Sequence, residues 1–309
     1  MILNKLLNIK YPIIQGAMAH IATGKFAAEV SNSGGLGVVS SAVYNPAEFR
    51  QEVRTCKNNT DKPFAVNLLL LHRQIDEIID VVLSENIKIV TTGAGNPSKY
   101  MDKFKAHGIK VMPVVSSVAL AKKMAREGAF AIIAEGSEAG GHVGDLSTMA
   151  LLPQVYEAVD IPVVAAGGIA TGRQLLAAKI LGACGAQIGT ALLATEECPI
   201  HESYRDSIVA ARSSRVVVIG GTNGYKTQVI KNNMSRKYIA AEKNGKSKEE
   251  LELYTLGALG RAVKEGDVIN GSLMAGQVVG QINHKTNLKT CFQTLMRDYE
   301  SVKQVICEC

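Results

Sequence analysis

Pro162-Val-Val-Ala-Ala-Gly-Gly168 is a short apolar run that ends in two glycines, and Ala186-Gln-Ile-Gly-Thr190 repeats the pattern further along the chain. An amphipathic stretch separates the two runs, and the same alternation fills the first 193 residues. Strands that are buried on both faces of a parallel sheet are continuous apolar runs, without a strict polar alternation. These stretches therefore predict parallel strands joined by helices.

Eight runs of this kind can be found before residue 194. They are Pro12–Met18, Leu36–Ser41, Pro63–Leu70, Ile89–Thr92, Lys110–Val115, Ala131–Glu135, Pro162–Ala166 and Ala186–Leu192. The stretches between them are predicted helices, for example Phe26–Ser31, Pro46–Cys56, Arg73–Leu83, Ala119–Arg126, Met149–Val159 and Arg173–Leu181. Eight βα units favour an α/β fold of the closed (β/α)8 type, a TIM barrel, over an open doubly wound sheet.

After residue 193 the rhythm changes. Pro199–Ala211 and Leu256–Glu265 have helical patterns, Arg215–Ile219 is a short β-like run, and Gly271–Gly280 resembles a helix start or cap. We predict a barrel over residues 1–194 and a smaller, mainly helical lid over residues 195–265, called the lid segment below. Residues 266–309 are expected to return to the barrel.

The composition is that of a globular protein. Of the 309 residues, 47% are hydrophobic and 20% are charged, which excludes a disordered chain. The net charge is +6, and the surplus is densest at Lys226, Lys231, Arg236 and Lys237. A solvated surface is the simplest interpretation of these lysines and arginines, and an anionic partner is the alternative.

The six cysteines indicate the compartment. None forms a C-x-x-C pair, so their spacing favours reduced thiols in a cytoplasmic protein over a disulfide frame or a zinc site. No apolar run reaches the roughly 18 residues that a membrane-spanning helix needs. We therefore expect no metal, no membrane and no nucleic-acid partner.

The two glycine turns predict a phosphate site. They end the seventh and eighth predicted strands, and in this fold the loops after those strands commonly bind phosphate. No G-x-G-x-x-G motif opens a βαβ unit, and Gly34-Gly-Leu-Gly37 precedes a strand, which is typical of a helix C-cap and turn. The cofactor is therefore expected to be a mononucleotide; tight barrel packing is the alternative explanation for the small residues.

Glu135-Gly-Ser-Glu-Ala-Gly-Gly-His142 follows the sixth predicted strand, on the rim where barrel enzymes place their active sites. A histidine among glycines has no apolar face to cover, so His142 is the main catalytic candidate. Glu135 could bind a ribityl hydroxyl or form a strand-end salt bridge. His20 is a weaker rim candidate, and Ser272 could begin a helix that faces an anion.

At these motifs the chain resembles the enoyl-acyl-carrier-protein reductase II (FabK-type) flavoenzymes, within the nitronate monooxygenase and 2-nitropropane dioxygenase-like family. The matching stretches are Tyr11–Met18, Lys62–Asn67, Val90–Tyr100, Ala134–His142, Ala165–Ile169 and Gly271–Gln277. Two of them, Thr-Thr-Gly-Ala-Gly-Asn-Pro and Glu-Ala-Gly-Gly-His, are most like the reductase subgroup.

The resemblance implies an FMN cofactor and NADH or NADPH as co-substrate. The implied FMN-binding residues are Gly16, Ala17, Met18, Asn67, Glu135, Ala139, Gly140, Gly167, Gly168, Gly189 and Thr190, with Met274 and Gln277 closing over the isoalloxazine edge. The implied reaction is reduction of a trans-2-enoyl thioester on acyl carrier protein in bacterial fatty-acid elongation, with His142 in catalysis. Some members are stimulated by a monovalent cation, and a homodimer is left open.

Three departures from the family pattern bear on specificity. Ala17 replaces a second glycine, and Ser40-Ser-Ala-Val-Tyr44 replaces a more glycine-rich turn, so Tyr44 is expected near the entrance. Val114 stands where some nitronate-oxidising relatives have lysine, which favours the reductase. The alternatives are a nitronate monooxygenase that uses FMN and dioxygen, and a flavin-binding regulatory protein without turnover.

Overall fold

The computed structural model describes every residue except Asn223 and Cys309, together with the backbone but not the side chain of Cys307. Eight parallel strands of the described residues form one sheet in the order β1-β9-β8-β6-β5-β4-β3-β2. They are β1 (Ile13–Gln15), β2 (Gly37–Ser40), β3 (Phe64–Leu69), β4 (Ile89–Gly93), β5 (Lys110–Val115), β6 (Ile132–Glu135), β8 (Val163–Ala166) and β9 (Gly185–Ile188). The predicted TIM-barrel fold is confirmed.

The barrel closes between its first and second strands. Ile14 and Leu36 form a parallel bridge, and the Gln15 N–H donates to the Leu36 carbonyl at 2.9 Å. The Gln15 side chain extends this contact, because its Oε1 accepts from the Val38 N–H at 3.0 Å. A buried glutamine at the end of β1 thus joins the two edges of the sheet.

Helices cover the barrel on its outside. They are α1 (Leu3–Leu7), α2 (Gly24–Asn32), α3 (Pro46–Asn59), α4 (Ile75–Ser84), α5 (Met101–Ala106), α6 (Val118–Arg126), α7 (Thr148–Ala158) and α8 (Gly172–Ile180). Side-chain caps explain where two of these helices begin. Asn45 with Glu48 forms a capping box at the start of α3, and Thr171 with Gln174 forms one at the start of α8.

The eighth predicted strand is too long. It was expected to reach Leu192, but β9 ends at Ile188 and Thr190–Ala194 forms the 3₁₀ helix η2. Gly189 leaves the extended conformation, with φ −125° and ψ −64°, and turns the chain at the barrel rim. The glycine turn therefore ends the strand before the apolar run ends.

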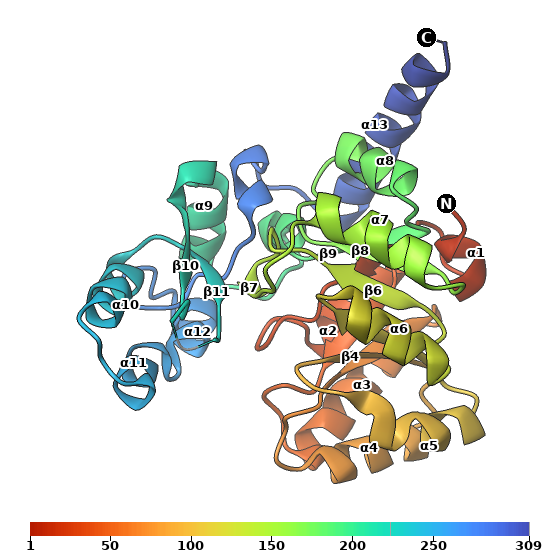
Figure 1. Cartoon of the computed structure of the whole chain (residues 1–309), viewed down its shortest axis with the longest axis horizontal. Helices are drawn as coiled ribbons and strands as arrows, with labels where there is room; N and C mark the ends of the chain where they lie inside the picture. The colour runs from red at the N-terminus through yellow and green to blue at the C-terminus, as the bar shows by residue number, and fades with distance from the viewer. Residues whose placement is uncertain (223, 309) are drawn as a thin grey trace.

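The lid segment lies beside the barrel mouth (Figure 1). It contains α9 (Glu202–Ala210), α10 (Asn233–Lys243), α11 (Lys248–Thr255), α12 (Ala258–Gly260) and a π-helical turn at Arg261–Glu265. It also contributes β10 (Val216–Ile219), which was predicted, and β11 (Thr227–Ile230), which was not. These two strands join β7 (Gly141–His142) of the barrel loop in an antiparallel sheet, so the lid segment is more mixed than predicted.

The C-terminal residues return to the barrel. Helix α13 (Leu288–Glu308) packs along α8, and its far end projects past the barrel (Figure 1). The buried Phe292 ring lies edge-on to Tyr11, with the two ring centroids 6.0 Å apart.

The helix start predicted at Ser272 is wrong. Ser272 is buried, and the next helical turn is η5 (Gln277–Gln281). No helix begins at Ser272 because residues 273–274 bridge to the lid strands instead.

Across the part of the chain that the structure describes, no helix combines the length and apolar character needed to cross a membrane.

Candidate active site

A cavity of about 590 Å³ opens at the carboxyl ends of the barrel strands and is bounded by the lid segment. Its volume lies in the usual range for small-molecule sites. Its wall contains His142 and all but one of the residues proposed to bind the cofactor: Gly16, Ala17, Met18, Asn67, Glu135, Ala139, Gly140, Gly167, Gly168, Gly189, Thr190 and Met274. Residues that are far apart in the sequence therefore share one cavity.

The loop after β8 has the geometry of an anion cradle. Gly167 and Gly168 have φ of +86° and +74°, a backbone region that favours glycine. A Cβ on Gly167 would lie 2.8 Å from the Gly136 carbonyl oxygen. Among the described residues no carbonyl accepts from the N–H groups of these two glycines, which leaves both amides free for a phosphate.

Glu135 ends β6 on the cavity floor. No side chain of the described residues forms a hydrogen bond or ion pair with its carboxylate, so the salt-bridge alternative is wrong. Desolvation by the surrounding barrel raises its pKa from 4.5 to about 7. A carboxyl group without a protein partner at this place suits a ligand hydroxyl, such as those of a ribityl chain.

His142 lies on β7, opposite Thr227 of β11. Although its side chain is open to the cavity, nearby protein atoms desolvate the imidazole and lower its pKa below 6.5. Among the described residues the ring has no hydrogen-bond partner, which leaves both nitrogens available to a ligand. The imidazole is therefore neutral at pH 7 and can accept or donate a hydrogen bond at the cavity surface.

The segment 271–277 is fixed at the cavity edge by buried polar contacts. The Tyr204 hydroxyl donates to the Met274 carbonyl at 2.8 Å, and the Gly276 N–H donates to Thr190 Oγ1 at 2.9 Å. Met274 lines the cavity. Gln277 does not: its Nε2 lies 3.3 Å from Gln228 Oε1 and 3.5 Å from the Ser137 carbonyl oxygen.

Several other residues shape the site. Val114 lies in the cavity wall as the sequence suggested, whereas Tyr44 and His20 do not. The sequence interpretation missed Gln228, Ser116 and Leu259. Ser116, in the loop after β5, and Leu259, on α12, line the cavity. Gln228 lies on β11, which the sequence did not predict, and bonds to the loop before His142 without lining the cavity.

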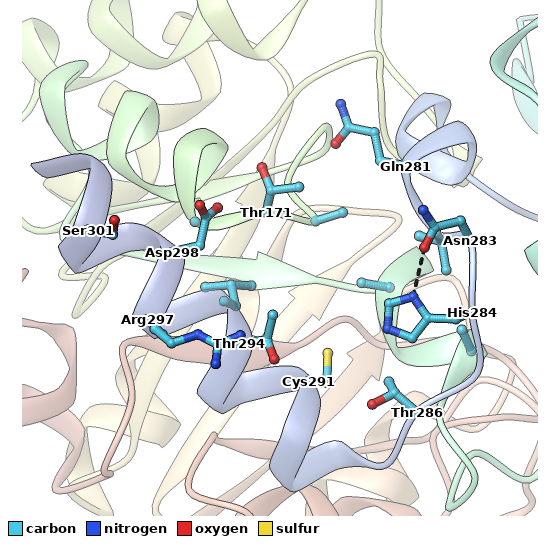
Figure 2. Close-up of a pocket in the computed structure, with 16 residues that line it drawn as sticks. Thr171, Gln281, Asn283, His284, Thr286, Cys291, Thr294, Arg297, Asp298 and Ser301 are labelled. Carbon is cyan, nitrogen blue, oxygen red and sulfur yellow. Dashed lines mark hydrogen bonds between the residues drawn. The ribbon is translucent and has the colours of Figure 1, made fainter. Parts of the chain in front are cut away.

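A second cavity of about 470 Å³ lies between α8, α13 and residues 281–286 (Figure 2). Its charged groups are already engaged or exposed. Asp298 accepts from the Arg173 N–H at 3.1 Å, and the His284 ring is hydrogen-bonded to Asn283 at 2.7 Å. The glycine cradle, Glu135 and His142 all belong to the first cavity, so we place the chemistry there.

The family model for nitronate monooxygenase matches residues 1–79 and 73–298. A Rhodococcus jostii protein, (3aS,4S,5R,7aS)-5-hydroxy-7a-methyl-1-oxo-octahydro-1H-indene-4-carboxyl-CoA dehydrogenase, is 31% identical over 94% of this chain and 92% of its own length. A probable nitronate monooxygenase of Staphylococcus saprophyticus is 33% identical over 75% of this chain and 79% of its own. The structure of FabK from Thermotoga maritima superimposes with a TM-score of 0.96 and 39% identity, over 99% of this chain and 98% of that one.

Proposed function

The chain belongs to the nitronate monooxygenase family of flavin-dependent oxidoreductases, and within it we propose that the protein reduces trans-2-enoyl thioesters with FMN and NADH or NADPH. The observation that carries the proposal is the single cavity that brings together the glycine cradle, the free carboxyl of Glu135 and the imidazole of His142. The similarity to FabK along nearly the whole chain supports the reductase over other members.

The residues present fit FMN. The free amides of Gly167 and Gly168 suit its phosphate, Glu135 suits a ribityl hydroxyl, and Met18 and Met274 supply apolar surface for its ring. When bound, FMN would supply the relay that accepts hydride from NAD(P)H and delivers it to the β-carbon of the enoyl thioester. The protein's own residues would position the substrate and set the electrostatics around it.

We assign to His142 the proton transfer that accompanies reduction of the thioester. Adding hydride at the β-carbon leaves negative charge on the α-carbon and the thioester oxygen, and this charge must be neutralised by a proton. Among the described residues the imidazole at the cavity wall has no hydrogen-bond partner, so it can hydrogen-bond the thioester carbonyl. Its protonated form, which becomes more populated as the pH falls below 7, can donate that proton. Val114, in the wall of the same cavity, adds no charged group there.

One experiment tests the reaction. The FMN-loaded protein is mixed anaerobically with NADH or NADPH, and loss of the visible absorbance of oxidised flavin reports reduction. Crotonyl thioester is then added. We expect the absorbance to return with the thioester, and no return with the thioester would contradict the proposal.

A second candidate, nitronate monooxygenase, rests on the family model and on the similarity to the Staphylococcus saprophyticus protein. It predicts oxygen uptake with a nitronate and no need for NADH. The same protein preparation separates the two candidates, because nitronate-dependent oxygen uptake without thioester-dependent reoxidation would favour the monooxygenase. A flavin protein without turnover would show neither reaction.

We infer that the thioester arrives on an acidic acyl carrier protein. Between Arg212 and Lys248 the chain has nine lysines and arginines and one acidic residue, against a net charge of +6 for all 309 residues. Arg236 and Lys237 are exposed on α10, a helix that lies on the side of the lid segment away from the barrel (Figure 1). Such a surface complements an acidic protein and would accelerate its association.

The docking idea is tested by reversing charge at Arg236 and Lys237. The double variant Arg236→Glu and Lys237→Glu should raise the KM for carrier-bound thioester several-fold, and leave the KM for the same acyl group on a small thiol unchanged. Lys122→Glu, at an exposed position of α6 on the barrel, is the control. An equal KM for both substrates in every variant would remove this surface from docking.

A further inference from the structure

The segment between β6 and α7, residues 136–147, is held from two sides. On the barrel side, the Glu138 carboxylate accepts from the Thr148 N–H at 2.8 Å and from the Thr148 hydroxyl at 3.1 Å. On the lid side, β7 pairs with β11, and the Val143 N–H donates to the Lys226 carbonyl at 3.0 Å. The loop that presents His142 therefore depends on both parts of the molecule.

Gln228 of β11 makes the side-chain contacts on the lid side. It is 1% exposed, and its Nε2 donates to the Ala139 carbonyl at 2.6 Å and also to the Ser137 carbonyl. Both amide hydrogens thus reach the loop, while Oε1 accepts from Gln277 Nε2 at 3.3 Å. In the strand register Gln228 lies opposite Gly141, directly beside the pair formed by Thr227 and His142.

The backbone just before His142 is made of two glycines. Gly140 and Gly141 are adjacent, and Gly141 has a φ of +76°, so the backbone before His142 has wide conformational freedom. A buried amide that holds two carbonyls just before these glycines restricts that freedom. Without it, the Ala139 carbonyl would lose its buried donor, and the Ser137 carbonyl would keep the longer contact from Gln277 Nε2 at 3.5 Å.

We propose that Gln228 is a positioning residue, which fixes residues 137–142 and through them the His142 imidazole at the cavity wall. The inference rests on the proposed function, because it assigns to the lid segment a part in the catalysis of thioester reduction, in addition to bounding the cavity. A displacement of about 1 Å in a reacting group can cost up to about 100-fold in rate. We therefore expect loss of the Gln228 amide to slow the step that His142 serves.

Gln228→Met tests this, because methionine keeps the length of the side chain and removes both N–H donors. In the FMN-loaded protein, we expect thioester-dependent flavin reoxidation to slow by about 10- to 100-fold. Reduction by NADH should change by less than about 3-fold, because His142 has no role in that half-reaction. Gln154→Met is the matched control, since the Gln154 amide is exposed and, among the described residues, bonds to the Ala150 carbonyl of its own helix.

A double-mutant cycle separates positioning from general damage. If Gln228 acts through His142, Gln228→Met should have almost no further effect in a His142→Ala background. Rate losses that multiply would overturn the proposal, as would a Gln228→Met protein with the wild-type rate. Gln228→Asn, which keeps the amide on a shorter side chain, covers the case in which the methionine variant fails to fold and should show an intermediate loss.

A readout without flavin completes the test. In the cofactor-free protein, amide hydrogen exchange over residues 137–146 should be faster in Gln228→Met than in wild type and in Gln154→Met. Unchanged exchange would overturn the inference even if activity fell. A wild-type flavin that the thioester does not reoxidise would instead contradict the proposed function, and the exchange measurement would still decide the role of Gln228.

Discussion

Replacing Glu135 by glutamine should stabilise the cofactor-free protein at high pH and leave its stability unchanged at low pH. The Glu135 carboxyl lines the cavity without a hydrogen-bond or ion-pair partner among the described residues, and desolvation raises its pKa from 4.5 to about 7. Between these values the unfolded chain has lost the proton and the folded chain still holds it. Native stability from this group is therefore complete below about pH 4.5 and is lost as the pH rises to about 7.

The size of the effect follows from the shift. Each pKa unit corresponds to about 1.4 kcal/mol, so a rise from 4.5 to about 7 costs up to about 3 kcal/mol at pH 8. Partial access of solvent to the cavity reduces this value, which makes it an upper bound. Glutamine resembles the protonated acid in shape and carries no charge, so Glu135→Gln should recover most of this free energy.

The assay is urea unfolding of the cofactor-free protein from pH 4 to pH 8, for wild type, Glu135→Gln and the exposed control Glu157→Gln. The difference between Glu135→Gln and wild type should be near zero below about pH 4.5, rise up to about pH 7 and then level off. The control difference should stay flat. A Glu135→Gln difference that is flat or falls with pH would refute the reasoning.

Three further predictions concern the cradle, the imidazole and the C-terminal helix. Gly167→Ala should weaken FMN binding at least about 10-fold, because φ is +86° and the new Cβ would lie 2.8 Å from the Gly136 carbonyl oxygen; flavin fluorescence titration measures this, and unchanged affinity would contradict the cradle. Because burial lowers the pKa of His142 below 6.5, thioester reduction should speed up as the pH falls toward that lowered value. In stopped-flow measurements His142→Ala should lack this acid limb, and its rate should be at least about 10²-fold lower than that of wild type. A matching acid limb in His142→Ala would assign the proton to another group. Phe292→Ala should cost about 3–5 kcal/mol in urea unfolding, because the ring is fully buried against Tyr11; a loss under about 1 kcal/mol would mean that α13 contributes little to the barrel.

Much of the barrel could be predicted because its strands are buried on both faces. Val163–Ala166 and its counterparts must be apolar throughout, and each ends where the chain meets the rim, so position and order follow from the pattern. The same rule placed the glycine turns and His142 on one rim. The end of β9 was missed because an apolar residue such as Leu192 is equally suited to a buried 3₁₀ turn.

The lid segment was harder to predict because its pairing is between distant residues. Strand β11 has only four residues, and its register depends on β10, on β7 and on a bridge from Val229 to Met274. Nothing local marks Gln228 as a buried residue that holds a loop about 90 positions away. Such contacts exist only once the barrel and the lid segment have come together.

The sequence by itself determined the (β/α)8 barrel, because burial on both faces imposes a continuous apolar pattern on every strand. It also determined which glycines and which histidine lie at the barrel mouth, since parallel strands all end at the same rim. Only the tertiary structure decided that Glu135 has no partner among the described residues, that Gln277 lies outside the cavity and that Gln228 bonds to the loop before His142. These features depend on distances between segments that are remote in the chain, and those distances are set by packing rather than by local pattern.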